Sequence, residues 1–168
     1  HSHAAGDCMM KRKRNYAVLP NEQTMVGYLD DPKATRDTRR GEWVTVDDLG
    51  RLDRDGYLYL SGRARDMVKT GGVNVYPAEV EEALMQHPAV RDAAVIGVRD
   101  AEWGERLVAV VVMRDPEFAV ESIEPWLKQR LSGPKIPRRW IRVEELPRNP
   151  TGKVLKTELR VRYADRAW

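Results

Sequence analysis

The stretch at residues 61–82, SGRARDMVKTGGVNVYPAEVEE, decides the fold of the chain around it. It begins with a basic cluster, passes through the glycine pair Gly71–Gly72, and ends in a predicted helix. Pro77 suits the first turn of this helix, because a helix offers no partner there for the missing N–H. Apolar residues at i, i+3 and i+4 from Val80 indicate one buried face, and Pro88 ends the helix.

Upstream of this stretch, the sequence predicts a β-hairpin. An Asp-Gly turn at Asp53–Gly56 separates two β-prone runs, Leu49–Leu52 and Tyr57–Leu60, which is a strong hairpin pattern. A further strand is predicted at Glu42–Val46. Because an isolated hairpin is marginally stable in water, the residues before Arg65 are not expected to form a full domain by themselves.

Downstream, short apolar runs predict strands at Ala93–Val98, Leu107–Met113 and Trp140–Val143. Two further helices are predicted, one that starts near Ser122 as its N-cap and one that carries Lys153 in its first turn. The part of the chain after the basic cluster therefore reads as a compact α+β unit, in which strands and helices share one core.

The composition restricts the class of protein. Among 168 residues, 29 basic and 26 acidic side chains leave a net charge of only +3, and their mixing predicts no nucleic-acid-binding stripe. The exception, Lys11–Arg14, suits nucleic acid or an acidic membrane, but is interpreted as part of a solvated tail over residues 1–20. The single cysteine, Cys8, excludes an internal disulfide and a Cys-based zinc site. With no apolar run of transmembrane length, a cytoplasmic protein is expected.

Three motifs follow one another along the chain: TVDDLG with DGYLYLSGR, then RDMVKTGGVNVYPAEVE, then ELPRNPTGKVLKTELR. Together they resemble the adenylate-forming (AMP-binding) acyl-CoA synthetase family, which includes the luciferases, from about Thr24 to Arg160. The resemblance implies a C-terminal domain with a small mixed β-sheet flanked by helices over residues 65–168. Residues 21–64 would be the end of the large N-terminal domain, whose missing remainder would be a partner of this chain.

The resemblance gives roles to Lys153, Arg65 and the loop at Gly71 and Gly72. Lys153 matches the catalytic lysine, which bridges the substrate carboxylate and the α-phosphate of ATP and lowers the repulsion between these anions. Arg65 falls at the hinge about which the C-terminal domain rotates once acyl-AMP has formed. The glycine loop then helps to form the channel for the coenzyme A thiol, where the lack of side chains allows close approach. A P-loop is excluded, because Pro147 stands where its first glycine would be.

The nucleotide ligands that the resemblance implies are Asp48 and Arg63. Asp48 matches the aspartate that accepts hydrogen bonds from the ribose hydroxyls of ATP, and Arg63 matches the arginine that reaches the ribose or the phosphate. Asp47 departs from the family, which usually has glycine here, so crowding of the nucleotide or of the backbone turn is expected. Without the neighbouring motifs, Asp48 would be interpreted as a turn aspartate and Arg63 as a solvated arginine.

The implied activity is a two-step ligation. A fatty or aryl carboxylic acid reacts with ATP to give acyl-AMP and pyrophosphate, and coenzyme A then gives acyl-CoA and AMP. ATP, Mg²⁺ and coenzyme A are expected in the complete enzyme, whereas no metal ligand is assigned to this chain. Because the family's phosphate-binding loop and acyl pocket have no counterpart here, we expect the chain alone to be inactive. The alternative is a non-catalytic, partner-binding module that keeps the same fold.

Overall fold

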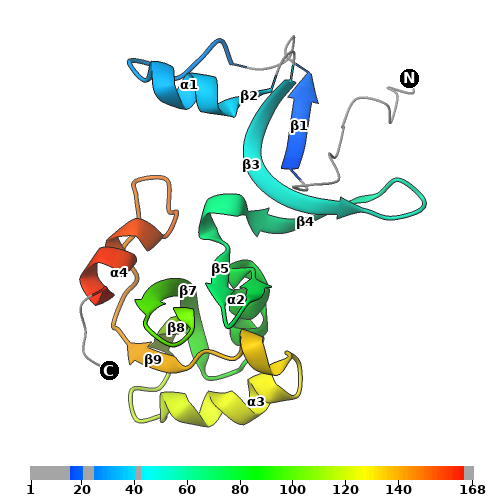
Figure 1. The fold of residues 1–168 in the computed structure, drawn as a ribbon. Coiled ribbons are helices and arrows are strands. Elements are labelled where there is room, and N and C mark those ends of the chain that lie inside the picture. Colours follow the sequence, from blue (N-terminus) through cyan, green and yellow to red (C-terminus); the bar gives the residue numbers. More distant parts are fainter. Residues whose placement is uncertain (1–15, 21–24, 41–42, 165–168) are drawn as a thin grey trace. The chain divides into compact units, whose positions relative to one another are not determined.

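A computed structural model describes residues 16–20, 25–40 and 43–164 (Figure 1). The chain divides into two compact units, residues 1–65 and residues 66–168. Cys8 and the basic run Lys11–Arg14 lie outside the described residues. Within the described parts, no helix is long and apolar enough to cross a membrane.

The first unit contains a small antiparallel sheet and one helix. Its elements are β1 (Tyr16–Pro20), α1 (Pro32–Thr38), β2 (Arg39–Arg40), β3 (Trp43–Leu52) and β4 (Leu58–Arg63). The long strand β3 pairs with each of the other three strands. The sequence predicts a tail for residues 1–20, whereas residues 16–20 form β1, because β3 supplies a distant partner for their backbone groups.

The predicted hairpin is confirmed as β3 and β4. In its turn, Asp53 Oδ1 accepts hydrogen bonds from the backbone N–H groups of Asp55 at 3.0 Å and Tyr57 at 2.9 Å. The two runs that the sequence separates before this turn belong to one strand, β3. It remains a single strand because β1, β2 and β4 bind its backbone along successive parts of its length.

The second unit is α+β, with a five-stranded mixed sheet in the order β6-β5-β8-β7 and with β9 parallel to β8. Its strands are β5 (Val68–Thr70), β6 (Val73–Val75), β7 (Val90–Asp100), β8 (Gly104–Met113) and β9 (Arg139–Arg142). Its helices are α2 (Pro77–Met85), α3 (Glu124–Lys128) and α4 (Lys156–Tyr163). The predicted fold class is therefore confirmed.

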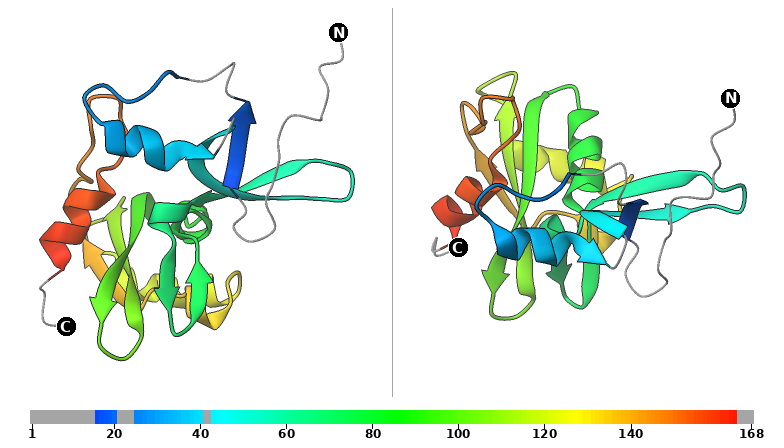
Figure 2. Two further views of the ribbon diagram at one scale, coloured as in Figure 1. Left: turned by 45° about the horizontal axis from the view of Figure 1, so that its top comes forward. Right: turned by 90° about the horizontal axis from the view of Figure 1, so that it is seen from above.

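Buried side chains lie on both faces of this sheet, whose strands run from green to orange in Figure 2. Successive residues of a strand point to opposite faces, and β7 alternates accordingly. Val95 packs in the cluster that contains Leu84 of α2, whereas Ile96 packs in the cluster that contains Leu159 of α4. Because helices cover both faces, β7 and β8 are nearly continuous apolar runs rather than alternating ones.

Two predicted helix starts are wrong. The helix predicted from Ser122 begins at Glu124, after a 3₁₀ turn, because the Ser122 hydroxyl donates to the Ala119 carbonyl and does not cap α3. The last helix begins at Lys156, so Lys153 precedes α4 instead of lying in its first turn.

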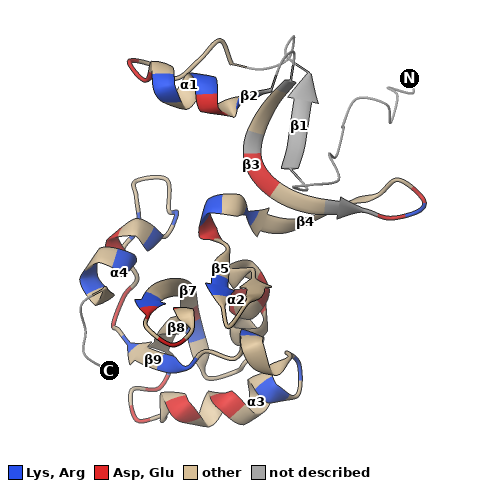
Figure 3. Ribbon diagram, in the orientation of Figure 1, with Lys and Arg blue, Asp and Glu red and all other residues tan. Residues whose placement is uncertain are grey.

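Basic and acidic side chains are interspersed on the helices at the surface (Figure 3). In α1, Lys33 pairs with Asp37 at 2.8 Å, and in α4, Arg162 pairs with Glu158 at 2.6 Å. Both are i,i+4 pairs on exposed helix surfaces, where solvent screens the attraction between the charges.

Candidate functional site

Lys153 lies in a tight turn that precedes α4. A backbone bridge joins Arg148 to Val154 at its base, and the Asn149 N–H donates to the Lys153 carbonyl at 2.9 Å. Gly152 has a φ of 84°, a left-handed conformation that favours glycine. The Lys153 side chain is exposed, and no described residue forms an ion pair or hydrogen bond with its ammonium group. This segment, residues 148–154, is called the Lys153 hairpin below.

The base of the Lys153 hairpin is anchored to two other elements. The Arg148 guanidinium forms an ion pair with Asp92 of β7 and donates to the Gly152 carbonyl. At the start of α4, Lys156 Nζ lies 2.7 Å from Glu81 Oε1 of α2, and both side chains are only 20% exposed. The same Glu81 oxygen accepts from the Val95 N–H at 2.7 Å. The hairpin therefore joins the sheet and α2 through charged hydrogen bonds.

Asp48 and Arg63 face each other across β3 and β4. They are directly opposite in the strand register, and Arg63 Nε lies 3.4 Å from Asp48 Oδ1. The Arg63 side chain is 42% exposed and that of Asp48 is 31% exposed, so both heads reach solvent. The structure thus brings together the two residues for which the resemblance implies a nucleotide-binding role.

Asp47 has a φ of 61°, in the left-handed region. Its N–H donates to Thr45 Oγ1 at 3.2 Å. Aspartate is one of the few residues besides glycine that adopt this conformation routinely. A backbone with this φ favours glycine, and in this chain aspartate adopts it.

Arg65 is exposed and is the last residue of the first unit. It lies in a 3₁₀ turn, Ala64–Asp66. The next residue, Asp66, pairs with Arg160 of α4, with Oδ1 and Nη2 2.9 Å apart. The first residue of the second unit is thus attached to its last helix.

Gly71 and Gly72 form the turn between β5 and β6, with φ angles of 56° and 79°. Their surroundings differ. A Cβ atom on Gly71 would lie 2.7 Å from the ring of Trp103, and the Gly71 N–H donates to the Trp103 carbonyl at 3.0 Å. A Cβ atom on Gly72 would meet nothing within 4 Å. Gly71 is therefore a packing position, whereas Gly72 faces open space.

Trp103 supports the glycine turn, although no role is predicted for it from the sequence. The backbone N–H of Trp103 donates to Asp100 Oδ1 at 2.9 Å. The Arg138 guanidinium carbon lies 3.8 Å from the centre of the Trp103 ring. The signal in the sequence was a tryptophan beside Gly104 in an otherwise polar turn. The pairing of Thr70 with Gly104 and the hydrogen bond from the Gly71 N–H to the Trp103 carbonyl show that this turn lies against the glycine turn.

We expect Asp100 to make the second unit sensitive to acid. The hydrogen bond from the Trp103 N–H, with further help from the Glu102 N–H and Arg106, holds the pKa of Asp100 below its ordinary value of 3.8. A lowered pKa in the folded state stabilises the fold above the ordinary pKa, and this contribution is lost as the pH falls through the folded-state pKa. Urea unfolding from about pH 6 to about pH 2 should show Asp100→Asn less stable at pH 6, with the difference shrinking towards pH 2. A difference independent of pH would contradict this assignment.

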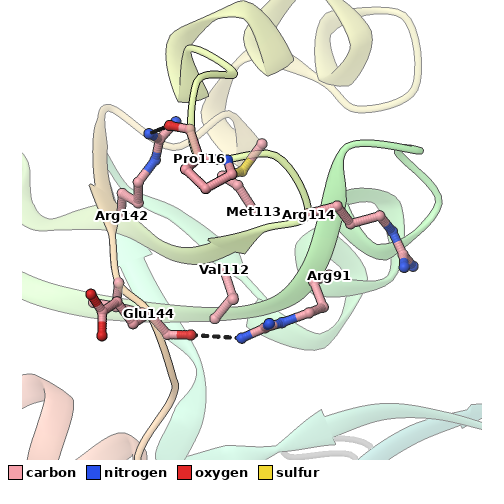
Figure 4. A pocket seen from close by; sticks show the side chains of 8 residues that line it. Arg91, Val112, Met113, Arg114, Pro116, Arg142 and Glu144 are labelled. Carbon is pink, nitrogen blue, oxygen red and sulfur yellow. Dashed lines mark hydrogen bonds between the residues drawn. The ribbon is translucent and has the colours of Figure 1, made fainter.

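One surface pocket has a volume of about 360 Å³ and lies at the ends of β7, β8 and β9 (Figure 4). None of the residues predicted from the sequence lines it. Arg91 donates to the Glu144 carbonyl at 2.7 Å, and Arg142 donates to the carbonyls of Pro116 and Phe118. Both guanidinium groups therefore tie down neighbouring loops. Elsewhere too, no three His, Cys, Asp or Glu side chains of the described residues gather as metal ligands.

Comparisons with known proteins identify relatives of this chain. Residues 79–153 match the AMP-binding enzyme C-terminal domain. The chain is 42% identical over 147 residues to the long-chain-fatty-acid–CoA ligase FadD13 of Mycobacterium tuberculosis, covering 88% of the chain and 29% of that ligase. It is 41% identical over 143 residues to a 2-succinylbenzoate–CoA ligase of Bacillus cereus, covering 85% of the chain and 30% of that ligase.

A solved structure is also similar. The o-succinylbenzoate CoA synthetase MenE from Bacillus subtilis, in complex with its acyl-adenylate intermediate, has a TM-score of 0.82 at 31% identity. The match covers 99% of this chain and 33% of that one, so the chain spans about a third of the length of these relatives. Fold, motifs and matches coincide on one conclusion: this chain carries the C-terminal domain of the adenylate-forming, AMP-binding enzyme family.

Proposed function

We propose that the chain is the C-terminal part of an ATP-dependent ligase that joins a fatty or aryl carboxylic acid to coenzyme A. In the first step, the carboxylate attacks the α-phosphorus of ATP, so that acyl-AMP forms and pyrophosphate leaves. In the second step, the coenzyme A thiol attacks the acyl carbon and AMP leaves. The names of the M. tuberculosis and B. cereus relatives, both CoA ligases, support this reaction class.

The proposal is supported above all by the way in which the structure holds the main chain of Lys153 and exposes its side chain. Its main chain is held in the Lys153 hairpin, while its ammonium group is exposed and meets no partner among the described residues. A cation held in this way can lie between the substrate carboxylate and the α-phosphate, where negative charge accumulates in the transition state. Such preorganised charge is among the largest contributions to enzymatic rate.

Asp48 and Arg63 are proposed to bind the nucleotide. One carboxylate oxygen of Asp48 faces Arg63 Nε, so its other oxygen can accept from a ribose hydroxyl. The Arg63 guanidinium keeps its terminal N–H groups for the ribose or a phosphate oxygen. Mg²⁺ is expected with ATP in the complete enzyme, but the described residues offer no cluster to hold it. We assign no step of the reaction to that ion.

Arg65 and the glycine turn are proposed to serve the second step. Arg65 ends the first unit, which suits a hinge at which the second unit changes orientation after acyl-AMP has formed. Gly72 faces open space, which suits the passage of the thin pantetheine arm of coenzyme A. In this proposal, residues 21–64 end the N-terminal domain, residues 65–168 form the C-terminal domain, and other residues supply the acyl pocket.

A chimera tests the proposed function. The chimera is the M. tuberculosis ligase in which the segment that aligns with this chain is exchanged for the 168 residues of this chain. Pyrophosphate release and acyl-CoA formation are then measured with a panel of carboxylic acids. We expect turnover of both kinds, well above that of the same chimera carrying Lys153→Ala. The 168-residue chain alone should release no pyrophosphate, because positioning of ATP and acid contributes roughly 7–11 kcal/mol to such reactions.

The second candidate is a non-catalytic, partner-binding module. The lack of a counterpart to the family's phosphate-binding loop among the 168 residues favours it for the chain in isolation. A chimera that folds, binds ATP and still releases no pyrophosphate would support this module and contradict the ligase.

A further inference from the structure

We propose that Asn149 is the positioning residue for Lys153, and that it sets the direction from which the lysine side chain leaves the main chain. This inference rests on the proposed function, because it gives Lys153 the catalytic role. Asn149 touches neither the substrate nor the nucleotide in this proposal. It acts through the backbone of the lysine four residues later.

The hydrogen bonds within the Lys153 hairpin converge on Asn149. Its carboxamide oxygen Oδ1 accepts from the Lys153 N–H at 2.8 Å, from the Thr151 N–H at 3.1 Å and from Thr151 Oγ1 at 2.8 Å. Its own N–H donates to the Lys153 carbonyl at 2.9 Å, and its carbonyl accepts from the Gly152 N–H at 2.9 Å. Both main-chain polar groups of Lys153 therefore bind the same residue.

This arrangement fixes the lysine backbone and leaves the side chain free. Two backbone N–H donors, which cannot act as acceptors, identify the atom facing them as the carboxamide oxygen. Asparagine suits the position because its short side chain can bond the main chain of following residues. The free ammonium group of Lys153 can then reach an anion without the hairpin changing shape. Catalytic groups need such support, because a displacement of about 1 Å can lower a rate about 10²-fold.

The anchors of the hairpin do not depend on Asn149. Arg148 pairs with Asp92, and Lys156 pairs with Glu81, outside the turn itself. Leu155 N–H donates to the Pro147 carbonyl at 2.8 Å. Removal of the Asn149 carboxamide should therefore loosen the turn locally while the second unit stays folded. This separates positioning from a general contribution to stability.

The first test is amide hydrogen exchange at single residues in the 168-residue chain. With Asn149→Ala, the Lys153 amide should exchange about two- to tenfold faster, as expected for loss of one hydrogen bond. Asn149→Asp keeps an acceptor at the same place and should restore the slow exchange. Thr151→Ala is the matched control, because it removes a bond to Asn149 Oδ1 without touching Lys153. Unchanged exchange at Lys153 in Asn149→Ala overturns the inference.

The second test measures acyl-AMP formation in the chimera described above. Asn149→Ala should lower kcat about 10- to 100-fold with little change in the KM for ATP. In a Lys153→Ala background, Asn149→Ala should add nothing, because residues that act through one group are not additive. Additive losses overturn the positioning role. If Lys153→Ala itself has no effect, the proposed function fails instead, while the exchange result still decides whether Asn149 holds the lysine backbone.

Discussion

Lys153→Ala is expected to slow acyl-AMP formation by about 10²- to 10³-fold in the active chimera, the range seen when one preorganised charge-stabilising donor is removed. Thioester formation from supplied acyl-AMP should stay within about twofold of the unaltered chimera. The reason is that the lysine neutralises two anions only while the carboxylate meets ATP. Once acyl-AMP has formed, the proposed rotation about Arg65 takes the lysine away from the reacting atoms.

The measurement is single-turnover kinetics of each half-reaction. Lys128→Ala is the matched control, because Lys128 is an exposed lysine of the same unit in an i,i+4 pair on α3. It should leave both steps unchanged. Equal losses of rate in both half-reactions for Lys153→Ala would contradict the catalytic role of Lys153, because they would indicate a general effect on folding or on nucleotide binding.

Gly72→Phe is expected to have the opposite selectivity. It should slow thioester formation about 10²-fold, on the scale of a misplaced reacting group, and leave pyrophosphate release nearly unchanged. A Cβ atom at Gly72 would meet nothing within 4 Å, so the side chain would enter the open space that is proposed for the pantetheine arm. Gly72→Ala is the control, because it has the same positive φ with little bulk. A collapse of acyl-AMP formation would assign this turn to the nucleotide site or to folding.

Gly71 gives a contrast within the same turn. A Cβ atom there would lie 2.7 Å from the Trp103 ring, and the Arg138 guanidinium carbon lies 3.8 Å from the centre of the same ring. Gly71→Ala should therefore destabilise the second unit by about 1–3 kcal/mol, the usual cost of overpacking, as measured by urea unfolding. A stable Gly71→Ala variant would show that Trp103 moves freely and does not support the turn.

The parts of the fold that sequence predicted well depend on local patterns. The apolar runs that became β7 and β8 are buried on both faces, and α2 follows from Pro77 and its apolar spacing. β1 was missed because its partner, β3, lies more than twenty residues away, and no local periodicity reports such a pairing. Lys153 was misplaced because side-chain bonds from Asn149 compete with a helical backbone.

The candidate site shows the same division. Asp48 and Arg63 each came from a motif, but only the strand register shows that they form an ion pair. The two glycines read alike in the sequence, yet Trp103 separates them into a packing position and an open one. The two glycines differ because of contacts between turns that are distant in the sequence. No local pattern in a single sequence reveals such contacts.

The ion pair between Asp66 and Arg160 has a consequence for the kinetics of the proposed reaction. It closes a loop of 94 residues, so that the first residue after the proposed hinge and the last helix belong to one body. In the proposed mechanism, the Lys153 hairpin and the glycine turn would then move together with this unit. One rotation at Arg65 would take the Lys153 hairpin away from the reacting atoms and bring the glycine turn towards them. The two half-reactions would therefore exclude each other in time, and acyl-AMP would be complete before a thiol could reach it.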